Sequence, residues 1–190
     1  MERTYISPGP AGLKALSHAG RLRMLGLLRS EGPATATTLA ARLGLNSGAT
    51  SYHLRQLEKH GFVVEDVERG NGRDRWWRAA HTTTRTNLIP ESPEDHDTYD
   101  AYLHAVATVY HERTLRSLEE RQLLPEPWRE IGDLSDWTLR LTPQRAEALV
   151  DAVHALIEEY AEDDDPDAAP FVVNFNAFVR PGFLDPEGEA

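Results

Sequence analysis

The sequence of 190 residues contains no cysteine, which excludes disulfide bonds and thiolate metal sites. Its first residues include no apolar stretch long enough for a secretory signal. No run approaches the roughly 18 apolar residues that span a bilayer. A nucleophile elbow, a phosphate-binding glycine loop and a HExxH zinc motif are absent too. We therefore expect a soluble, cytoplasmic protein that is not an enzyme, has no cofactor and does not enter a membrane.

Charge is divided unevenly along the chain, whose net charge is −11. Residues 1–81 carry 12 basic and 7 acidic residues, a net charge of +5. Residues 82–190 carry 8 basic and 24 acidic residues, a net charge of −16. The basic part suits an anionic partner such as nucleic acid, and phosphate would repel the acidic part. The acidic surface can equally serve solubility alone, so both interpretations stay open.

Two helices are predicted at the start of the chain. Apolar residues at helical spacing indicate a first helix over residues 13–30. Thr35 or Thr37 can cap a second helix, because a threonine hydroxyl accepts hydrogen bonds from the free N–H groups of a first turn. This second helix ends at Gly44.

A third helix and a hairpin follow directly. Asn46 or Ser47 can cap the helix, and Gly61 lies just past its end as a C-terminal cap. Strands are predicted over residues 62–68 and 74–79, and the Asn-Gly step between them is a strong hairpin signal. Helices and hairpin in this order predict a winged helix-turn-helix, a fold that reads the major groove of duplex DNA.

The predicted fold class is α+β, with the winged helix-turn-helix over residues 11–81 and a linker over residues 82–93. An apolar stripe then indicates a long helix from about Pro93 to Leu123. We assign residues 94–190 to this long helix and to a small strand–helix–strand regulatory domain.

The strand–helix–strand pattern is read from alternation and capping. Residues 136–141 place Trp137, Leu139 and Leu141 on one face of a strand. A helix with a buried apolar face follows from a cap at Thr142, and residues 171–180 again alternate as a strand. Two strands alone are marginally stable, so they are expected to pack on the long helix or to pair with another copy of the chain.

Candidate DNA contacts lie at the second and third helices and in the wing turn. The N-terminal residues of a reading helix lie near base edges, where hydroxyl, amide and guanidinium groups contact bases or phosphates. A wing arginine can enter the adjacent minor groove, whose negative potential attracts it. The predicted contacts are Thr35, Thr37, Ser47, Gly48, Thr50, Ser51, Tyr52, His53, Arg55, Gln56, Arg69, Asn71, Arg73 and Arg75.

Some of these residues have a second interpretation. His53 either contacts the nucleic acid or is a partly buried histidine bonded to the backbone. The wing cations either bind DNA or give a solvated hairpin its solubility. Trp76 and Trp77 point to opposite faces of their strand, and one of them is expected in the core.

The segment from Leu13 to Ala79 resembles the ArsR-type winged helix-turn-helix regulators of bacteria. The resemblance rests on ALSHAGRLRMLGLL, on LAARLGLNSGATSYHLRQLEKHGFV and on the wing GNGRDRWWR, and it covers about a third of the chain. It implies a homodimer that binds an imperfect palindrome in double-stranded DNA and usually represses a promoter. Family dimers usually use the first helix and the helix after the wing, here the one near residues 94–123.

The chain departs from the metal sensors of that family. The cysteine pair that such sensors often carry in the reading helix is absent here. Other members bind metal through acidic and histidine ligands of the last helix. Asp100, His104 and His111 share one face of the long helix approximately, and such residues suit zinc or nickel. Solvated side chains are the simpler interpretation, so we expect no metal.

The function of the C-terminal part is left open between several interpretations. It can set dimer geometry and bind a hydrophobic small-molecule effector, or its aromatic residues can form an ordinary core. The alternative to a DNA-binding regulator is a protein–protein interaction module that uses a winged helix without binding DNA. The aromatic residues that could line an effector site or form a core are Tyr99, Tyr102, Tyr110, Trp128, Trp137, Phe175 and Phe178.

Overall fold

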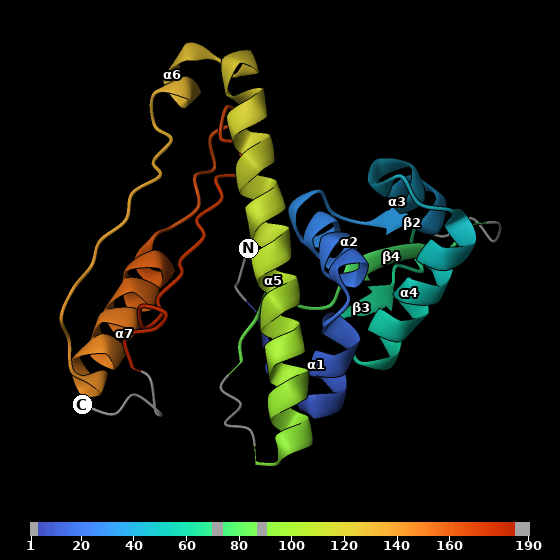
Figure 1. Cartoon of the computed structure of the whole chain (residues 1–190). Coiled ribbons are helices and arrows are strands. Elements are labelled where there is room, and N and C mark those ends of the chain that lie inside the picture. Colours follow the sequence, from blue (N-terminus) through green and yellow to red (C-terminus); the bar gives the residue numbers. More distant parts are fainter. Residues whose placement is uncertain (1–3, 70–73, 87–90, 185–190) are drawn as a thin grey trace. The chain divides into compact units, whose positions relative to one another are not determined.

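A computed structural model describes residues 4–69, 74–86 and 91–184. The chain forms two compact units, Met1–Leu123 and Leu124–Ala190, and each is described by itself (Figure 1). The first unit is a mixed α+β winged helix-turn-helix followed by a long helix, as predicted. No helix within the described ranges is both long and apolar enough to cross a membrane.

The first unit begins with two helices where one was predicted. The expected single helix over residues 13–30 is wrong: α1 (Pro10–Leu16) and α2 (Ala19–Ser30) are separated by Ser17 and His18. His18 has an extended backbone, and its Nδ1 accepts a hydrogen bond from the Gly20 amide at 3.1 Å. This cap starts a new helix. The apolar residues keep a helical spacing through both helices, so the spacing alone does not reveal the break.

The caps of the next two helices agree with the sequence. Thr35 caps α3 (Ala36–Leu43), its hydroxyl accepting from the Thr38 amide at 3.1 Å. Asn46 caps α4 (Ser47–Lys59), its Oδ1 accepting from the Ala49 amide at 2.7 Å. Gly44, with φ of 64°, and Gly61, with φ of 75°, follow these helices in left-handed conformations that favour glycine.

The wing sheet has one strand more than the sequence predicted. β3 (Val63–Glu65) and β4 (Trp76–Ala79) pair antiparallel as expected, although both are shorter than predicted. β2 (Ala34–Thr35) pairs with the other edge of β4, so the order is β2-β4-β3. In a separate sheet, β1 (Tyr5–Ile6) pairs in parallel with β5 (Thr83–Thr84). Strand β5 lies inside the predicted linker. The predicted Asn-Gly turn lies outside the described residues.

The core of the first unit lies between the helices and the wing sheet. Trp77 is 3% exposed and Trp76 is only partly buried, which confirms that one of the two belongs to the core. Apolar side chains from α1, α2, α3, α4, β3, β4 and the long helix meet there: Leu13, Leu16, Met24, Leu25, Leu28, Leu39, Leu54, Leu57, Phe62, Val63, Trp77 and Tyr102.

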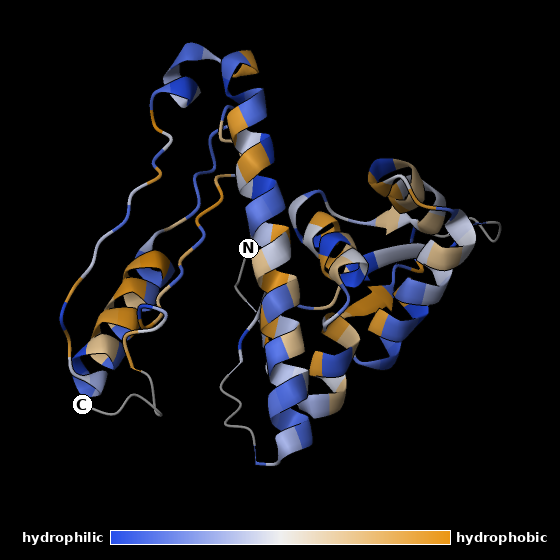
Figure 2. Cartoon of the chain, viewed as in Figure 1, coloured by the Kyte–Doolittle hydropathy of each residue, from blue (hydrophilic) through white to orange (hydrophobic). Residues whose placement is uncertain are grey.

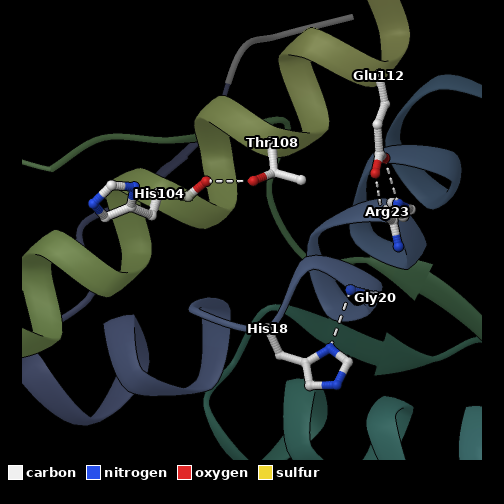
Figure 3. A network of polar contacts seen from close by, with 6 residues as sticks. All are labelled: His18, Gly20, Arg23, His104, Thr108 and Glu112. Atoms are coloured by element: carbon white, nitrogen blue, oxygen red, sulfur yellow. Dashed lines mark hydrogen bonds and ion pairs between the residues drawn. The ribbon is translucent and has the colours of Figure 1, made fainter.

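The long helix α5 (Pro93–Glu120) is present as predicted and continues into the short 3-10 turn η1 (Arg121–Leu123). The predicted domain boundary separates this helix from the N-terminal helices, whereas its contacts join it to α1 and α2. Tyr102, Ala105 and Val109 are the residues buried by this packing. An ion pair between Arg23 of α2 and Glu112 of α5 adds to it (Figure 3).

The second unit contains two helices and, within its described residues, no strand. These helices are α6 (Glu126–Arg129) and α7 (Pro143–Glu159), and Thr142 caps the latter as predicted. The strands predicted over 136–141 and 171–180 are not formed, because a strand requires a hydrogen-bonded neighbour and neither segment has one here. The predicted buried face of α7 is also wrong, since none of its residues is buried.

The cap of α4 offers a direct test of this architecture. Replacing Asn46 by alanine leaves the Ala49 amide without its acceptor, so we expect the free energy of unfolding to fall by about 1 kcal/mol. Urea unfolding followed by circular dichroism measures the change. Asn176→Ala, an exposed amide in the second unit, is the control and should leave the midpoint where it is. A midpoint that is equal in both variants contradicts the assigned cap.

Candidate nucleic-acid interface

Helix α4 is positioned by its apolar face and presents its polar face outward. Leu54 and Leu57 are fully buried, which fixes the rotation of the helix about its own axis. The residues of the opposite face are polar. Ser47, Gly48, Tyr52 and Arg55 are exposed, whereas Ser51 and Gln56 are partly buried.

Thr50 does not belong to this outward face, in contrast to the sequence-based prediction. Its side chain is fully buried, and its hydroxyl donates a 3.0 Å hydrogen bond to the Asn46 carbonyl. Position 50 follows Asn46 by one helical turn, so a hydroxyl there bonds back to that carbonyl instead of reaching solvent. The spacing of polar residues alone did not distinguish it from its exposed neighbours.

His53 faces the junction of α1 and α2. Its ring centroid lies 4.5 Å from that of His18 and 5.6 Å from that of Tyr52. Its Nδ1 is buried and makes no hydrogen bond with any described residue, so the structure does not show the backbone bond that the sequence left open. Burial lowers the pKa of His53 below its ordinary value, and His18 and Arg21 lower it further.

The two threonines at the start of α3 differ in their availability. The Thr35 hydroxyl is already engaged, since it caps α3 and lies 3.0 Å from the Thr38 hydroxyl. The side chain of Thr37 is exposed. Thr37 is therefore the more accessible of the two for a phosphate contact.

The wing arginines that the structure describes are paired with carboxylates. Arg75 donates to Glu65, with 2.9 Å from its Nε to Oε2, and lies 5.2 Å from the centroid of the Trp77 ring. This hydrogen bond raises the pKa of Arg75. Arg69 forms an ion pair with Asp66 at 3.5 Å. The other two predicted wing contacts, Asn71 and Arg73, lie outside the described residues.

The sequence-based predictions did not include the two acidic partners of the wing. Asp66 lies only three residues before its partner Arg69 in the chain. Glu65 could have been found from the hairpin register, which places it opposite Trp77 and therefore close to Arg75. Cross-strand pairs of opposite charge of this kind stabilise a sheet. Both guanidinium groups are more than half exposed, so solvent weakens the pairs and a phosphate can compete for the arginines.

The candidate metal ligands on α5 are not brought together. Asp100, His104 and His111 are all exposed. Over residues 4–69, 74–86 and 91–184, no group of three or more histidine, aspartate or glutamate side chains could hold a metal ion. The His104 carbonyl instead accepts a hydrogen bond from the Thr108 hydroxyl at 2.8 Å (Figure 3).

The aromatic residues proposed for an effector are dispersed. Tyr102 belongs to the core of the first unit, and Tyr99 packs against that core. Trp137 and Phe178, in the second unit, are largely exposed. The first unit has a hollow of about 270 Å³ beside α1 and α5, but none of these aromatic residues lines it; its lining residues are Lys14, Ser17, Glu94, Asp97, Thr98 and Ala101.

Comparison with known proteins supports the helix-turn-helix. A family model described as a helix-turn-helix domain matches residues 16–66, which include α2, α3, α4 and β3. A solved structure of ZitR from Lactococcus lactis, a C30AH42A mutant in apo form, shares 18% identity. The match covers 75% of this chain and 83% of that one, but its TM-score of 0.32 is too low to carry an argument. No curated protein matches the sequence.

The partly buried His53 predicts an acid-sensitive fold. Because the pKa of His53 lies below its ordinary value of 6.5, the unfolded chain binds more protons than the folded chain near that pH. Stability should therefore fall as the pH drops below about 6.5 and recover as the pH rises. Thermal unfolding between pH 5 and 8, in roughly half-unit steps, measures this dependence.

Matched histidine variants separate the contribution of His53. His53→Gln should flatten the acid slope, although His60 keeps part of it because its pKa is lowered as well, by burial and then by Lys59 and Arg21. His104→Gln on the exposed side of α5 should retain the full slope. Identical slopes for the two variants would show that His53 does not determine the acid response.

Proposed function

We propose that the protein is a sequence-specific, DNA-binding transcriptional regulator, a dimeric repressor that binds an imperfect palindrome. The observation that carries this proposal is the orientation of α4, whose leucines anchor it in the core and whose N-terminal polar residues and Arg55 face outward. A helix held in this way beside a β-hairpin suits the major groove. The helix-turn-helix match over residues 16–66 supports the same function.

Several polar residues of α4 have a role in this proposal. Ser47 and Gly48 begin the helix, where short side chains and the positive end of the helix dipole favour close approach to a phosphate. Arg55 and Gln56 lie further along, and their side chains are suited to guanine and adenine edges, respectively. Tyr52 contributes a hydroxyl from an exposed ring. Thr50 has no part, because it is buried.

The homodimer is proposed on α5. Tyr102, Ala105 and Val109 cover the core of its own chain, while Leu103, Leu115 and Leu118 are exposed apolar residues of the same helix. A second copy can cover such a stripe by the self-complementary contact of a two-fold dimer. Two reading helices in a dimer then meet successive major grooves, roughly 34 Å apart, and the two-fold symmetry of the dimer is matched by a palindromic site.

The remaining parts of the chain complete the proposal. Residues 11–81 bind DNA, residues 82–93 link, and residues 94–190 set the dimer and bind a small-molecule effector. The regulator acts in the cytoplasm and is not an enzyme. The net charge of −16 over residues 82–190 keeps the C-terminal part away from the phosphate backbone.

A protein-interaction module is the second candidate, and the carboxylates beside the wing arginines favour it. Glu65, Asp66 and Glu68 lie beside the described wing arginines, and two of these carboxylates pair with them. A winged helix with neutralised arginines could bind a protein instead of DNA. The salt dependence of binding distinguishes the two functions, since the affinity of phosphate-driven binding falls steeply as the salt concentration rises.

Selection of bound fragments from the source genome at two salt concentrations tests the proposal. Enrichment of a two-fold-symmetric site, with a steep loss of binding at the higher salt, is the expected result. Binding to other proteins that is insensitive to salt, with no fragment enriched at either concentration, would favour the interaction module.

The reading residues should determine sequence preference. Arg55→Ala or Gln56→Ala should weaken binding to the selected site by about 1–3 kcal/mol and relax specificity at one base pair, if either side chain makes a bidentate base contact. Fluorescence anisotropy with the selected site and with its single-base variants measures both effects. Arg140→Ala, which removes an equal charge from the second unit, should bind as the parent does.

The carboxylate partner of Arg75 should oppose DNA binding. Glu65→Gln removes a negative charge and releases Arg75 for phosphate, so affinity should rise at low salt and the salt slope should steepen by about one ion. Glu126→Gln in the second unit removes the same charge and serves as the control. An unchanged slope in Glu65→Gln would mean that Arg75 does not reach the phosphate backbone.

A further inference from the structure

Two segments of the second unit have the sequence pattern of strands but no strand partner. Neither 136–141 nor 171–180 is paired with another segment within the described ranges. Main-chain N–H and C=O groups that leave water need hydrogen-bond partners, and a neighbouring strand supplies them for an extended chain. Both segments are therefore suited to joining a sheet, and the described residues of one chain do not supply that sheet.

The side chains of these segments leave a large apolar surface exposed. Trp137 and Phe171, which lie on the apolar faces of their segments, are 78% and 61% exposed. An aromatic side chain buries roughly 150–250 Å² when fully covered, so these two alone present on the order of 300 Å². Leu139, Val173 and Val179 add to this surface. A stable interface takes roughly 800 Å² from each partner, a size that these residues approach together.

Helix α7 shares this exposure and is connected to the second segment. Leu149 and Leu156 are exposed on α7, and Figure 2 shows orange, apolar stretches along the helix. The ring of His154 on α7 lies 6.1 Å from that of Phe175, with the two planes nearly perpendicular. Helix α7 and residues 171–180 are thus in contact with each other, and apolar side chains of both remain exposed.

The strands of the first unit do not suit these segments as partners. Each is only two to four residues long, and β4 is already paired on both sides. The segments themselves span six and ten residues by the sequence pattern, so the matching partners are the same segments in another copy. Residues 171–180 contain no acidic residue, so two copies of this segment can approach without repulsion between carboxylates.

We propose that the second units of two chains complete one another, and that residues 136–141 and 171–180 of both chains form a single intermolecular sheet covered by the two α7 helices. A two-fold axis pairs identical segments in antiparallel directions. The acidic run from Glu162 to Asp167 flanks the second segment and opposes the addition of further chains. This proposal extends the dimer proposed above and does not depend on DNA binding.

A single spin label on the full-length protein tests the sheet. Because the chain has no cysteine, labelled Thr138→Cys carries one nitroxide, and every distance measured by pulsed dipolar spectroscopy is a distance between copies. The expected result is one narrow distance distribution that disappears when labelled chains are mixed with excess unlabelled chains before assembly. A broad distribution, or no distance between copies, would overturn the proposal.

Two charge substitutions in the same segment provide a matched comparison. Val173→Asp places a carboxylate on the apolar face and should abolish the narrow distance, whereas Asn176→Asp places it on the polar face and should retain it. Equal effects of the two substitutions would overturn the proposed faces. Amide hydrogen exchange on both variants should show loss of protection over residues 136–141 and 171–180 in the first variant alone.

DNA binding by the same samples separates this proposal from the proposed function. A labelled chain that binds its selected DNA site but gives no narrow distance overturns the intermolecular sheet and leaves the regulator intact. A chain that gives the narrow distance but enriches no DNA supports the sheet and counts against the regulator.

Discussion

The burial of Leu54 and Leu57 is the constraint on which the rest of the proposed interface depends. Removing either side chain would leave a cavity that costs about 2–5 kcal/mol. More importantly, their burial fixes which residues of α4 face outward, because residues of a helix keep constant angular positions. Arg55 is exposed for the same reason that its neighbour Leu54 is buried. The packing of the core thus determines which polar residues of α4 form the candidate surface.

Electrostatics divides the candidate surface into two parts with different properties. On α4, Arg55 faces solvent directly, whereas on the wing Arg69 and Arg75 are held by Asp66 and Glu65. A phosphate must replace a carboxylate at the wing, which reduces the net gain of each contact there. The proposed function therefore assigns sequence preference to α4 and, to the wing, an attraction to phosphate that the carboxylates weaken.

The two units obtain their stability in different ways. The first unit buries apolar residues from most of its elements, and α5 closes the core with Tyr102. The described residues of the second unit have no buried side chain, although α7 and the two flanking segments are rich in apolar residues. Folding has to offset the loss of conformational entropy by burial, and the intermolecular sheet proposed above would supply that burial for the second unit.

Local signals in the sequence predicted the cap at Thr142 and the helix end before Gly61, because a cap depends on neighbouring residues. The same signals limited the other two caps to Thr35 or Thr37 and to Asn46 or Ser47. The extent of α5 followed from its apolar spacing for the same reason. The break at His18 comes from a local cap that the apolar spacing does not reveal. Tertiary structure decided the burial of Thr50 and the pairing of Arg75 with Glu65, since each depends on how neighbouring segments pack in three dimensions. Strand formation over 136–141 and 171–180 is the clearest case. Alternation provides a strand with its two faces, but a hydrogen-bonded neighbour is what makes it a strand, and residues distant in sequence or in another chain must supply that neighbour.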